Sequence, residues 1–153
     1  MTVWTSLYTS SCAIVIATLL GVPIGLWLGL NRFRGRQLLI TLLNTLMALP
    51  TVVVGLLLFG LLSRQGPLGP LGLLFTPLAM IAGQMVLATP IVANLVLAAA
   101  TGADRRIINT ALTLGASRLQ AAAKLLSEIR FGIMAAVIVG FGRVIAEVGV
   151  AMM

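Results

Sequence analysis

The chain has 153 residues, of which 60% are hydrophobic and only 8% are charged, and its mean hydropathy is +1.16. This composition is far more apolar than that of a soluble domain and places the chain in a lipid bilayer. The formal charge of +7 does not indicate a nucleic-acid-binding protein, because the ten Lys and Arg residues separate long apolar runs instead of lining one polar face.

The composition also excludes several kinds of active site. There is no His, so the commonest general base and the commonest metal ligand are both missing. Lys124 follows three alanines and is the only lysine, so the sequence has no Gly-Lys-Ser/Thr phosphate-binding loop. Cys12 is the single cysteine and is expected to be a small buried hydrophobic residue. We therefore predict a non-catalytic protein without a metal site or cofactor, which does not hydrolyse ATP by itself.

Four apolar stretches are long enough to cross a bilayer core of about 30 Å, which takes roughly 20 residues of helix. These stretches predict an all-α polytopic membrane protein whose spans cover Leu7–Leu30, Leu38–Leu62, about Leu78–Ala100, and Phe131 to Met153. The last run is still apolar where the sequence stops. We therefore expect the fourth span to be incomplete, the chain to be shortened at its C-terminus, and at least one further helix to follow.

The distribution of cations predicts the topology. Three arginines, Arg32, Arg34 and Arg36, follow the first span, and five cations lie within residues 101–130, whereas the intervening loop of residues 63–77 holds only Arg64. The positive-inside rule places the two basic loops in the cytoplasm and the N-terminus outside. Nothing at the N-terminus resembles a signal peptide, since no cation precedes the first apolar run. Gly and Pro in the outer loop predict turns.

Glycines and prolines within the spans predict how the helices pack and bend. Gly21, Gly25 and Gly29 form a stripe at four-residue spacing that permits close helix packing, either within one subunit or between two copies. A proline lies inside each of the first three apolar runs and is expected to bend or open its helix, at positions Pro23, Pro50 and Pro90.

Five polar side chains within the spans are expected to form hydrogen bonds between helices rather than to be substrate ligands. They are Asn44, Thr45, Gln84, Thr89 and Asn94.

The loop of residues 101–130 has apolar residues at helical spacing on both sides of Gly115, which predicts two short helices separated by a glycine turn. Two interpretations of this loop remain open at this point. It could form a compact knob on which a soluble partner docks. Alternatively, it could be an ordinary interfacial helix that carries Arg and Lys towards anionic lipid.

This loop resembles the cytoplasmic loop of the integral membrane subunits of ABC importers. The pattern of that family is Glu-Ala-Ala, three residues, Gly, nine residues and Ile-x-Leu-Pro. Aligned on Gly115, Ala111 agrees and Leu125 is conservative, whereas Asn109 replaces the acidic residue and the Leu-Pro pair is absent. The resemblance implies that the loop inserts into a cleft of the ATP-hydrolysing subunit, with a coupling set of Asn109, Thr110, Ala111, Gly115, Ala116, Ser117, Arg118 and Leu125.

Other stretches are similar to the tungstate and molybdate permeases of the same family. Asn44 to Gly55 resembles their second helix, whereas Ser63 to Gly69 with Leu74 to Pro77, and Gly140 to Gly149, look especially like the tungstate branch. The resemblance covers nearly the whole chain. It implies a type I ABC importer permease-like helical bundle, with residues 1–153 as the transmembrane permease domain, residues 101–130 as its coupling loop, and a fifth helix beyond them.

The same resemblance implies the function and the partners. The expected protein is the permease subunit of an ATP-driven importer in the cytoplasmic membrane, which translocates an oxyanion, most simply tungstate, with molybdate or sulfate as alternatives. It implies a homodimer in the lipid membrane, a separate ATP-binding cassette ATPase and an extracytoplasmic substrate-binding protein, with no nucleic acid. A passive anion channel is the alternative from another class. A membrane hydrolase finds no support, because its serine would have to work with Lys124, which lies in the cytoplasmic loop.

Two charged residues lie within the fourth predicted span. Arg143 and Glu147 are one helical turn apart, so their side chains can reach each other. An arginine in the middle of a membrane costs about 2.5–3.5 kcal/mol on insertion, so it needs a partner or a function. We favour a position on the translocation pathway or gate, where Arg143 helps the anion to cross and Glu147 holds the guanidinium. A structural ion pair that fixes helix packing is the alternative.

Overall fold

The chain folds into a bundle of α-helices. The computed structural model describes residues 2–63, 66–67, 70, 72 and 76–151, and the regular elements within these ranges are all helical. This confirms the predicted all-α class. In chain order the elements are α1 (Thr2–Leu30), α2 (Arg36–Ala48), α3 (Thr51–Leu62), α4 (Pro77–Gly102), α5 (Arg105–Thr113), α6 (Arg118–Glu128) and α7 (Arg130–Ala151).

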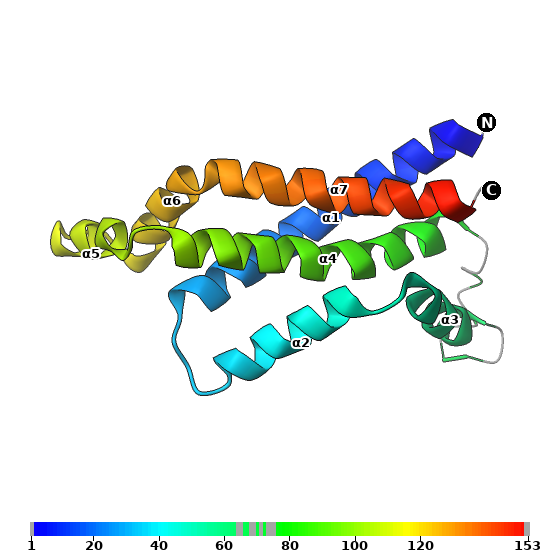
Figure 1. Ribbon diagram of the computed structural model, residues 1–153, viewed down its shortest axis with the longest axis horizontal. Coiled ribbons are helices and arrows are strands. Elements are labelled where there is room, and N and C mark those ends of the chain that lie inside the picture. The colour runs from blue at the N-terminus through cyan, green and yellow to red at the C-terminus, as the bar shows by residue number, and fades with distance from the viewer. Residues whose placement is uncertain (1, 64–65, 68–69, 71, 73–75, 152–153) are drawn as a thin grey trace.

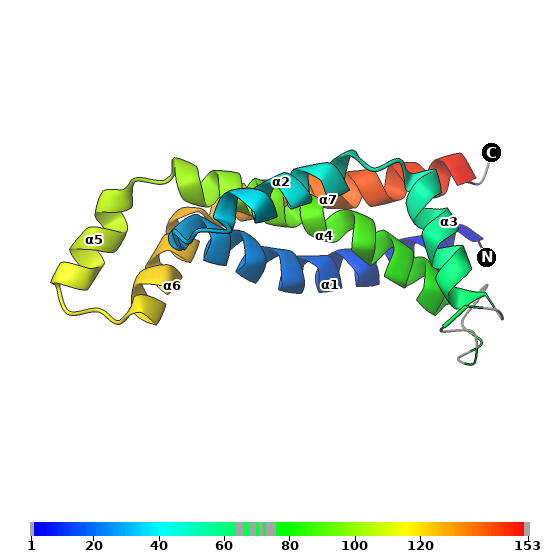
Figure 2. The same cartoon turned by 90° about the horizontal axis from the view of Figure 1, so that it is seen from below.

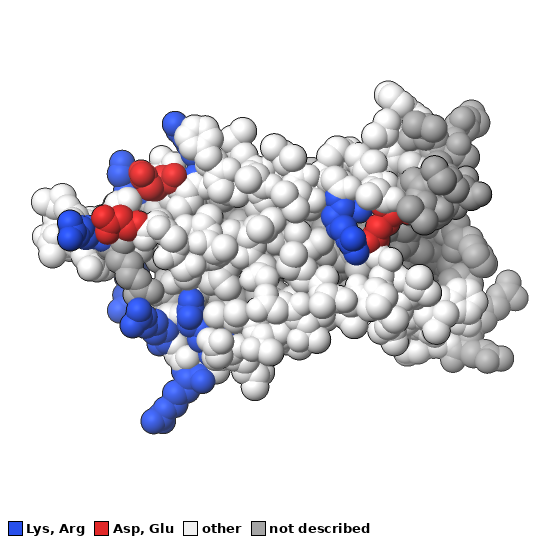
Figure 3. Space-filling model, viewed as in Figure 1, with Lys and Arg blue, Asp and Glu red and all other residues white. Residues whose placement is uncertain are grey.

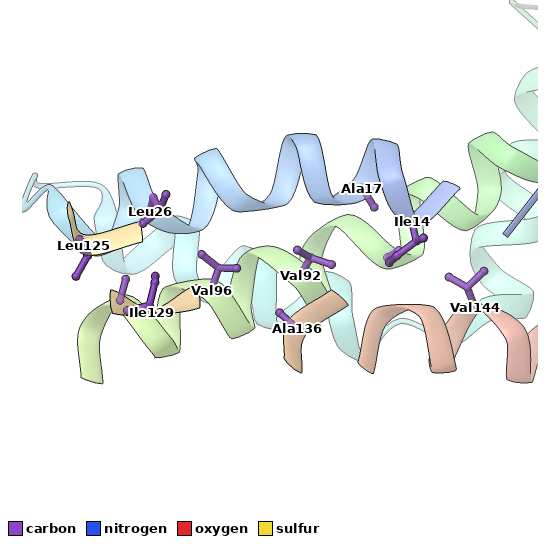
Figure 4. Packing of buried hydrophobic residues seen from close by; sticks show 11 residues of the cluster. Ile14, Ala17, Leu26, Val92, Val96, Leu125, Ile129, Ala136 and Val144 are labelled. Atoms are coloured by element: carbon purple, nitrogen blue, oxygen red, sulfur yellow. The ribbon is translucent and has the colours of Figure 1, made fainter. Parts of the chain in front are cut away.

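Three long helices, α1, α4 and α7, lie side by side and form the body of the molecule (Figures 1 and 2). Their buried faces meet in one apolar cluster, in which Ile14 of α1, Val92 of α4 and Val144 of α7 are among the shared residues (Figure 4). The cluster extends to Leu125 and Ile129, at the junction of α6 and α7. The core therefore links the three long helices to the end of the α5–α6 segment.

The glycine stripe of α1 brings this helix against α4. A Cβ atom on Gly25 would lie 2.5 Å from the carbonyl oxygen of Ala93, and one on Gly29 would lie 2.8 Å from Cβ of Ala100. The absence of side chains allows the two backbones to approach this closely. Packing within one subunit, one of the two interpretations of the stripe, is therefore confirmed. Gly132 of α7 makes a similar close approach to Ala99 of α4, and Gly140 of α7 lies close to Ile14 of α1 and Val92 of α4.

The second predicted span, Leu38–Leu62, is formed by two helices rather than one. Helices α2 and α3 meet at an angle of 96°. The break lies at Leu49 and Pro50, which both adopt extended backbone angles, with ψ of 132° and 134°. A proline disfavours the helical conformation in the residue before it, so Leu49 ends α2. The predicted bend at Pro50 is thus confirmed.

The other two prolines do not interrupt their helices. Pro23 lies inside the 29 residues of α1, and Pro90 lies inside the 26 residues of α4. A proline removes one backbone hydrogen bond, and a long helix packed against its neighbours retains the bonds on either side of that position. Neither proline therefore breaks its helix as Pro50 does, and the expected bend or opening at these two sites stays a prediction.

Two of the described helices, α1 and α4, are by themselves long and apolar enough to cross a membrane, and the number rises to four if each bent pair is counted as one span. The bent pairs are α2 with α3 and α6 with α7. This agrees with the number of predicted spans. Much of the outer loop, including Arg64, lies outside the described residues, as do the last two residues of the chain.

Candidate functional site

The loop of residues 101–130 forms a hairpin of two short helices, α5 and α6, which projects beyond one end of the three long helices (Figures 1 and 2). Asp104 caps the start of α5, where its carboxylate accepts a hydrogen bond of 2.9 Å from the backbone N–H of Arg106. A capping box starts α6: the Ser117 N–H donates to Gln120 Oε1 at 2.8 Å, and the Gln120 N–H donates to Ser117 Oγ at 3.3 Å. The predicted helix–turn–helix is confirmed.

Gly115 makes the turn of the hairpin possible. Its φ of +86° lies in the left-handed region, which other residues adopt only at a cost. Two backbone hydrogen bonds close the turn, from Ala116 N–H to Ala111 C=O at 3.0 Å and from Gly115 N–H to Leu112 C=O at 3.1 Å. This arrangement is a Schellman motif, which satisfies the last carbonyls of α5. The hairpin therefore has a fixed bend rather than a flexible link.

A groove of about 590 Å³ lies between α5 and α6. Large apolar side chains are exposed on the same hairpin: Leu114 and Leu119 are each 83% exposed, and Leu112 is also exposed. Such residues on an element outside the bundle are typical of a surface that binds another protein. The residues that line the groove are Arg106, Ile107, Thr110, Ala111, Leu114, Ala116, Gln120 and Lys124.

The eight predicted coupling residues separate into four groups in the structure. Thr110, Ala111 and Ala116 line the groove, together with residues outside the predicted coupling set, such as Leu114 and Gln120. Gly115 forms the turn, and Asn109, Ser117 and Arg118 are exposed. Leu125 differs from the rest, because it is fully buried in the core cluster. It links the hairpin to the long helices instead of contributing to the exposed surface.

The hairpin is connected directly to α7. Helix α6 ends at Glu128 and α7 begins at Arg130, with a bend of 66° between them. Ile129 forms the joint: its N–H donates to Leu125 C=O at 2.9 Å, and its own C=O accepts from Ile133 N–H at 3.0 Å. Since Leu125 and Ile129 are both buried, a displacement of α6 must displace this end of α7 or break the packing at the joint.

The second candidate set lies further along α7. Arg143 Nε and Glu147 Oε1 are 3.1 Å apart, which confirms the predicted contact, and they form the one ion pair within the described part of the chain. The Arg143 side chain is 51% exposed and that of Glu147 is 23% exposed. In Figure 3 one blue patch and one red patch lie side by side among uncharged residues, well away from the other charged side chains, which gather at the end of the molecule that carries the hairpin. The structure therefore does not bring the two predicted sets together.

The polar residues within the spans are paired in two different ways. Asn94 of α4 donates a hydrogen bond to Asn44 of α2, as predicted for an interhelical contact. For Thr45 and Thr89 this prediction is wrong, because each hydroxyl donates to the carbonyl four residues earlier in its own helix, at 2.8 and 2.7 Å. The Oε1 atom of Gln84 is buried and accepts no hydrogen bond from the described residues. Among these five residues, in the part of the chain that the structure describes, Asn94 is thus the donor that connects two helices, to Asn44 and, at 3.7 Å, to Met47 Sδ of α2.

Comparison with known proteins gives a family match over most of the chain. Residues 21–153 match the family described as the binding-protein-dependent transport system inner membrane component. A probable anion ABC transporter permease protein of Haloferax volcanii is 39% identical over 94% of this chain. Tungstate uptake system permease proteins (TupB) of Peptoclostridium acidaminophilum and Campylobacter jejuni are 36% and 39% identical, over 98% and 97% of this chain. The matched regions span 62%, 66% and 62% of the length of these three relatives, respectively.

Proposed function

Because the chain belongs to the family of binding-protein-dependent transport system inner membrane components, we propose that it is the membrane-spanning subunit of an ATP-driven oxyanion importer. The fold is accordingly that of a helical type I ABC importer permease. In this proposal a separate ATP-hydrolysing subunit docks on the α5–α6 hairpin. The single observation that carries the docking site is the exposure of Leu114, which lines the groove, and of Leu119 on the same hairpin, the element that projects from the bundle.

The hairpin and α7 provide a route from ATP hydrolysis to the membrane. When the ATPase subunits close, the hairpin moves with them as a unit, because the turn at Gly115 is fixed by its Schellman hydrogen bonds. The movement reaches α7 through Ile129, which is buried at the bend. Arg143 and Glu147 lie on the same helix. Rotation or tilting of α7 therefore shifts the charged pair relative to the pathway and changes the side to which it opens.

Arg143 is the proposed contact for the transported anion. Its guanidinium presents several N–H donors, whose geometry suits an oxyanion. Glu147 holds the guanidinium and keeps the anion from binding too tightly, so that the anion can leave again. Tungstate is the proposed substrate, because two of the relatives are named as tungstate uptake permeases. Molybdate and sulfate are the alternatives, since they have the same charge and a similar tetrahedral shape.

A second copy and two further partners complete the proposed importer. None of the thirteen residues of α2, all of them described, is buried in the single chain, and α3 buries only Val54 and Leu62. This exposed apolar surface supports a homodimer with the pathway between the copies. The other partners are the ATPase subunits and an extracytoplasmic protein that delivers the anion. The hairpin faces the cytoplasm, and the N-terminus faces outward.

The experiment that tests the proposal is uptake of submicromolar tungstate, molybdate and sulfate by cells that lack the complete gene, with and without its restoration. We expect restoration to return tungstate uptake. Gly115→Val should lower it at least tenfold while the protein still reaches the membrane, because a β-branched residue at a φ of +86° distorts the turn. The matched control is Gly102→Val at the end of α4, where an added Cβ meets no atom within 4 Å.

Each other outcome of this experiment has a defined meaning. Unchanged uptake of all three anions on restoration would contradict the oxyanion assignment. Restored uptake that persists in Gly115→Val cells, or that continues when ATP is depleted, would contradict the docking role and favour a passive anion channel. Equal loss in the Gly102→Val control would show that the readout reports damage to this end of the protein rather than to the turn.

A further inference from the structure

The connection between α1 and α2 carries three arginines, Arg32, Arg34 and Arg36, within five residues. The sequence contains no Asp or Glu before Asp104. Within the described ranges, none of the three guanidinium groups has a carboxylate partner. In Figure 3 the blue side chains over this connection lie apart from the red side chains of the hairpin. This end of the α1–α2 pair therefore carries a positive charge that nothing in the described chain neutralises.

One of the three arginines holds the connection in place. The Nε–H group of Arg36 donates a hydrogen bond of 2.7 Å to the carbonyl of Leu28, in the last turn of α1. The side chain of Asn31 donates to the carbonyl of Trp27 at 3.1 Å. The Arg36 contact satisfies a carbonyl that the end of a helix leaves free, and the Asn31 side chain adds a second donor to the Trp27 carbonyl, which also accepts the Asn31 backbone N–H at 3.0 Å. Arg32 and Arg34 are both exposed. The connection is thus an ordered turn that presents two free cations.

Aromatic residues lie beside these cations. The rings of Trp27 and Phe33 are in contact, with centroids 4.9 Å apart and an angle of 39° between their planes. Trp27 is nevertheless 52% exposed, and Leu38, in the first turn of α2, is exposed as well. Tryptophan is enriched at the boundary between the hydrocarbon and the headgroups of a bilayer. The arginines and the apolar surface are therefore placed where a lipid presents its phosphate and the start of its acyl chains.

We propose that the α1–α2 connection is a binding site for an anionic phospholipid. Arg32 and Arg34 bind the headgroup phosphate, while Trp27, Phe33 and Leu38 contact the glycerol and the first part of an acyl chain. Charge complementarity selects this occupant, because the free cations have no partner in the described chain. Such a lipid would hold the cytoplasmic end of α1 at the bilayer surface while the α5–α6 hairpin moves. The site depends on the membrane position of the chain but not on the identity of the transported anion.

The test measures lipid binding by the purified membrane protein in a neutral detergent. Native mass spectrometry or titration would compare phosphatidylglycerol with phosphatidylcholine for the natural protein, for Arg32→Gln/Arg34→Gln, and for Arg118→Gln/Lys124→Gln. The last pair is the matched control, because it removes the same charge from two exposed positions on the hairpin. Arg36 is left unchanged, since its loss would also remove a hydrogen bond of the turn.

We expect phosphatidylglycerol to bind the natural protein more tightly than phosphatidylcholine does. The Arg32→Gln/Arg34→Gln change should weaken the binding of phosphatidylglycerol about 30-fold, as expected for the loss of two cations beside an anionic surface. The Arg118→Gln/Lys124→Gln control should change this binding less than threefold, which is roughly the effect expected from exposed surface charges. Trp27→Leu, with both arginines present, should also weaken binding several-fold.

Three results would overturn this proposal. The first is equal binding of the two lipids by the natural protein. The second is a loss in the hairpin control as large as that in the Arg32/Arg34 variant, which would indicate a general effect of net charge. The third is full displacement of phosphatidylglycerol by millimolar inorganic phosphate, which would indicate a site for a free anion. Because none of these readouts involves transport, failure here leaves the importer proposal untouched, and failure of the importer proposal leaves the lipid site untouched.

Discussion

The α1–α4–α7 bundle and the α2–α3 pair are built in different ways, although both consist of apolar helices. In the bundle, glycines and small residues allow the backbones to approach closely, and the buried residues gather there. In the α2–α3 pair, Leu38, Val52 and Leu56 are among many large apolar residues that remain exposed. A single copy therefore encloses only part of the apolar surface that its sequence provides.

This difference follows from the side chains at the helix contacts. Without water, helices associate through packing and polar contacts, and small residues give the closest packing. Gly25 meets Ala93 in the bundle, whereas α2 is attached to α4 by the hydrogen bond between Asn44 and Asn94. An apolar pocket of about 390 Å³ remains between α3 and α4. The bundle is thus a fixed body, and the α2–α3 pair is the part that lipid or a second copy is expected to cover.

The largest expected effect comes from filling the contact between α1 and α4. Gly25→Leu places a side chain where a Cβ alone would lie 2.5 Å from the Ala93 carbonyl oxygen, so the two backbones must separate. We expect it to lower the free energy of unfolding by about 3 kcal/mol, the upper end of the range for overpacking. Thermal unfolding in a neutral detergent measures this loss of stability. Gly60→Leu on α3 is the control, since its Cβ meets no atom within 4 Å. Equal destabilisation of both variants would contradict the distinction between the two regions.

A smaller effect is expected from the attachment of α2. Asn94→Leu removes the hydrogen bond to Asn44 and leaves that amide unpaired, which should cost roughly 1–2 kcal/mol. Hydrogen exchange should increase in α2 and remain unchanged in α1. Thr45→Val is the control, because the Thr45 hydroxyl bonds within its own helix. The double change Asn44→Leu/Asn94→Leu should recover much of the stability that Asn94→Leu loses. Faster exchange throughout α1 would mean that the two regions are not independent.

The smallest expected effect on stability concerns the charged pair of α7. Arg143→Gln and Glu147→Gln should each cost about 1 kcal/mol, and the double variant less than the sum, because the pair is partly exposed. Stability and tungstate uptake together distinguish the two roles of the pair. A pathway role predicts that the double variant folds almost normally and transports at least tenfold less. Normal uptake in that variant would assign the pair to helix packing instead.

The sequence correctly predicts those features of the fold that depend on a single residue or on one apolar stretch. The four apolar stretches correspond to α1, the bent α2–α3 pair, α4 and α7, and Gly115 and Pro50 mark the turn and the bend that the structure has. The capping box of Ser117 and Gln120 was readable from its spacing but was not predicted. The sequence could not show that Thr45 bonds within its own helix whereas Asn44 bonds to another helix. Both lie in the same apolar run, and only the packing of α2 on α4 decides which of them reaches a partner.

The different positions of the predicted coupling residues also depend on the three-dimensional structure. The sequence pattern groups Leu125 with the exposed residues around Gly115, because the pattern contains only the spacing of these residues along the chain. The structure buries Leu125 in the core and exposes Leu114, which lies outside the predicted coupling set. Burial of an apolar residue in a short amphipathic helix depends on which neighbour covers it, and here α6 turns its Leu125 face towards the junction with α7.

Co-purification of an ATPase subunit with this protein tests the docking role of the α5–α6 hairpin most directly. The protein would be isolated from its own cells as the natural form, as Leu114→Asp, and as Ala123→Asp, which adds the same charge to an exposed position on α6 that does not line the groove. We predict that an ATP-binding cassette subunit accompanies the natural protein and the Ala123→Asp control, and that Leu114→Asp retains at least tenfold less of it. Absence of any ATPase from the natural protein, or equal amounts with all three forms, would contradict this role.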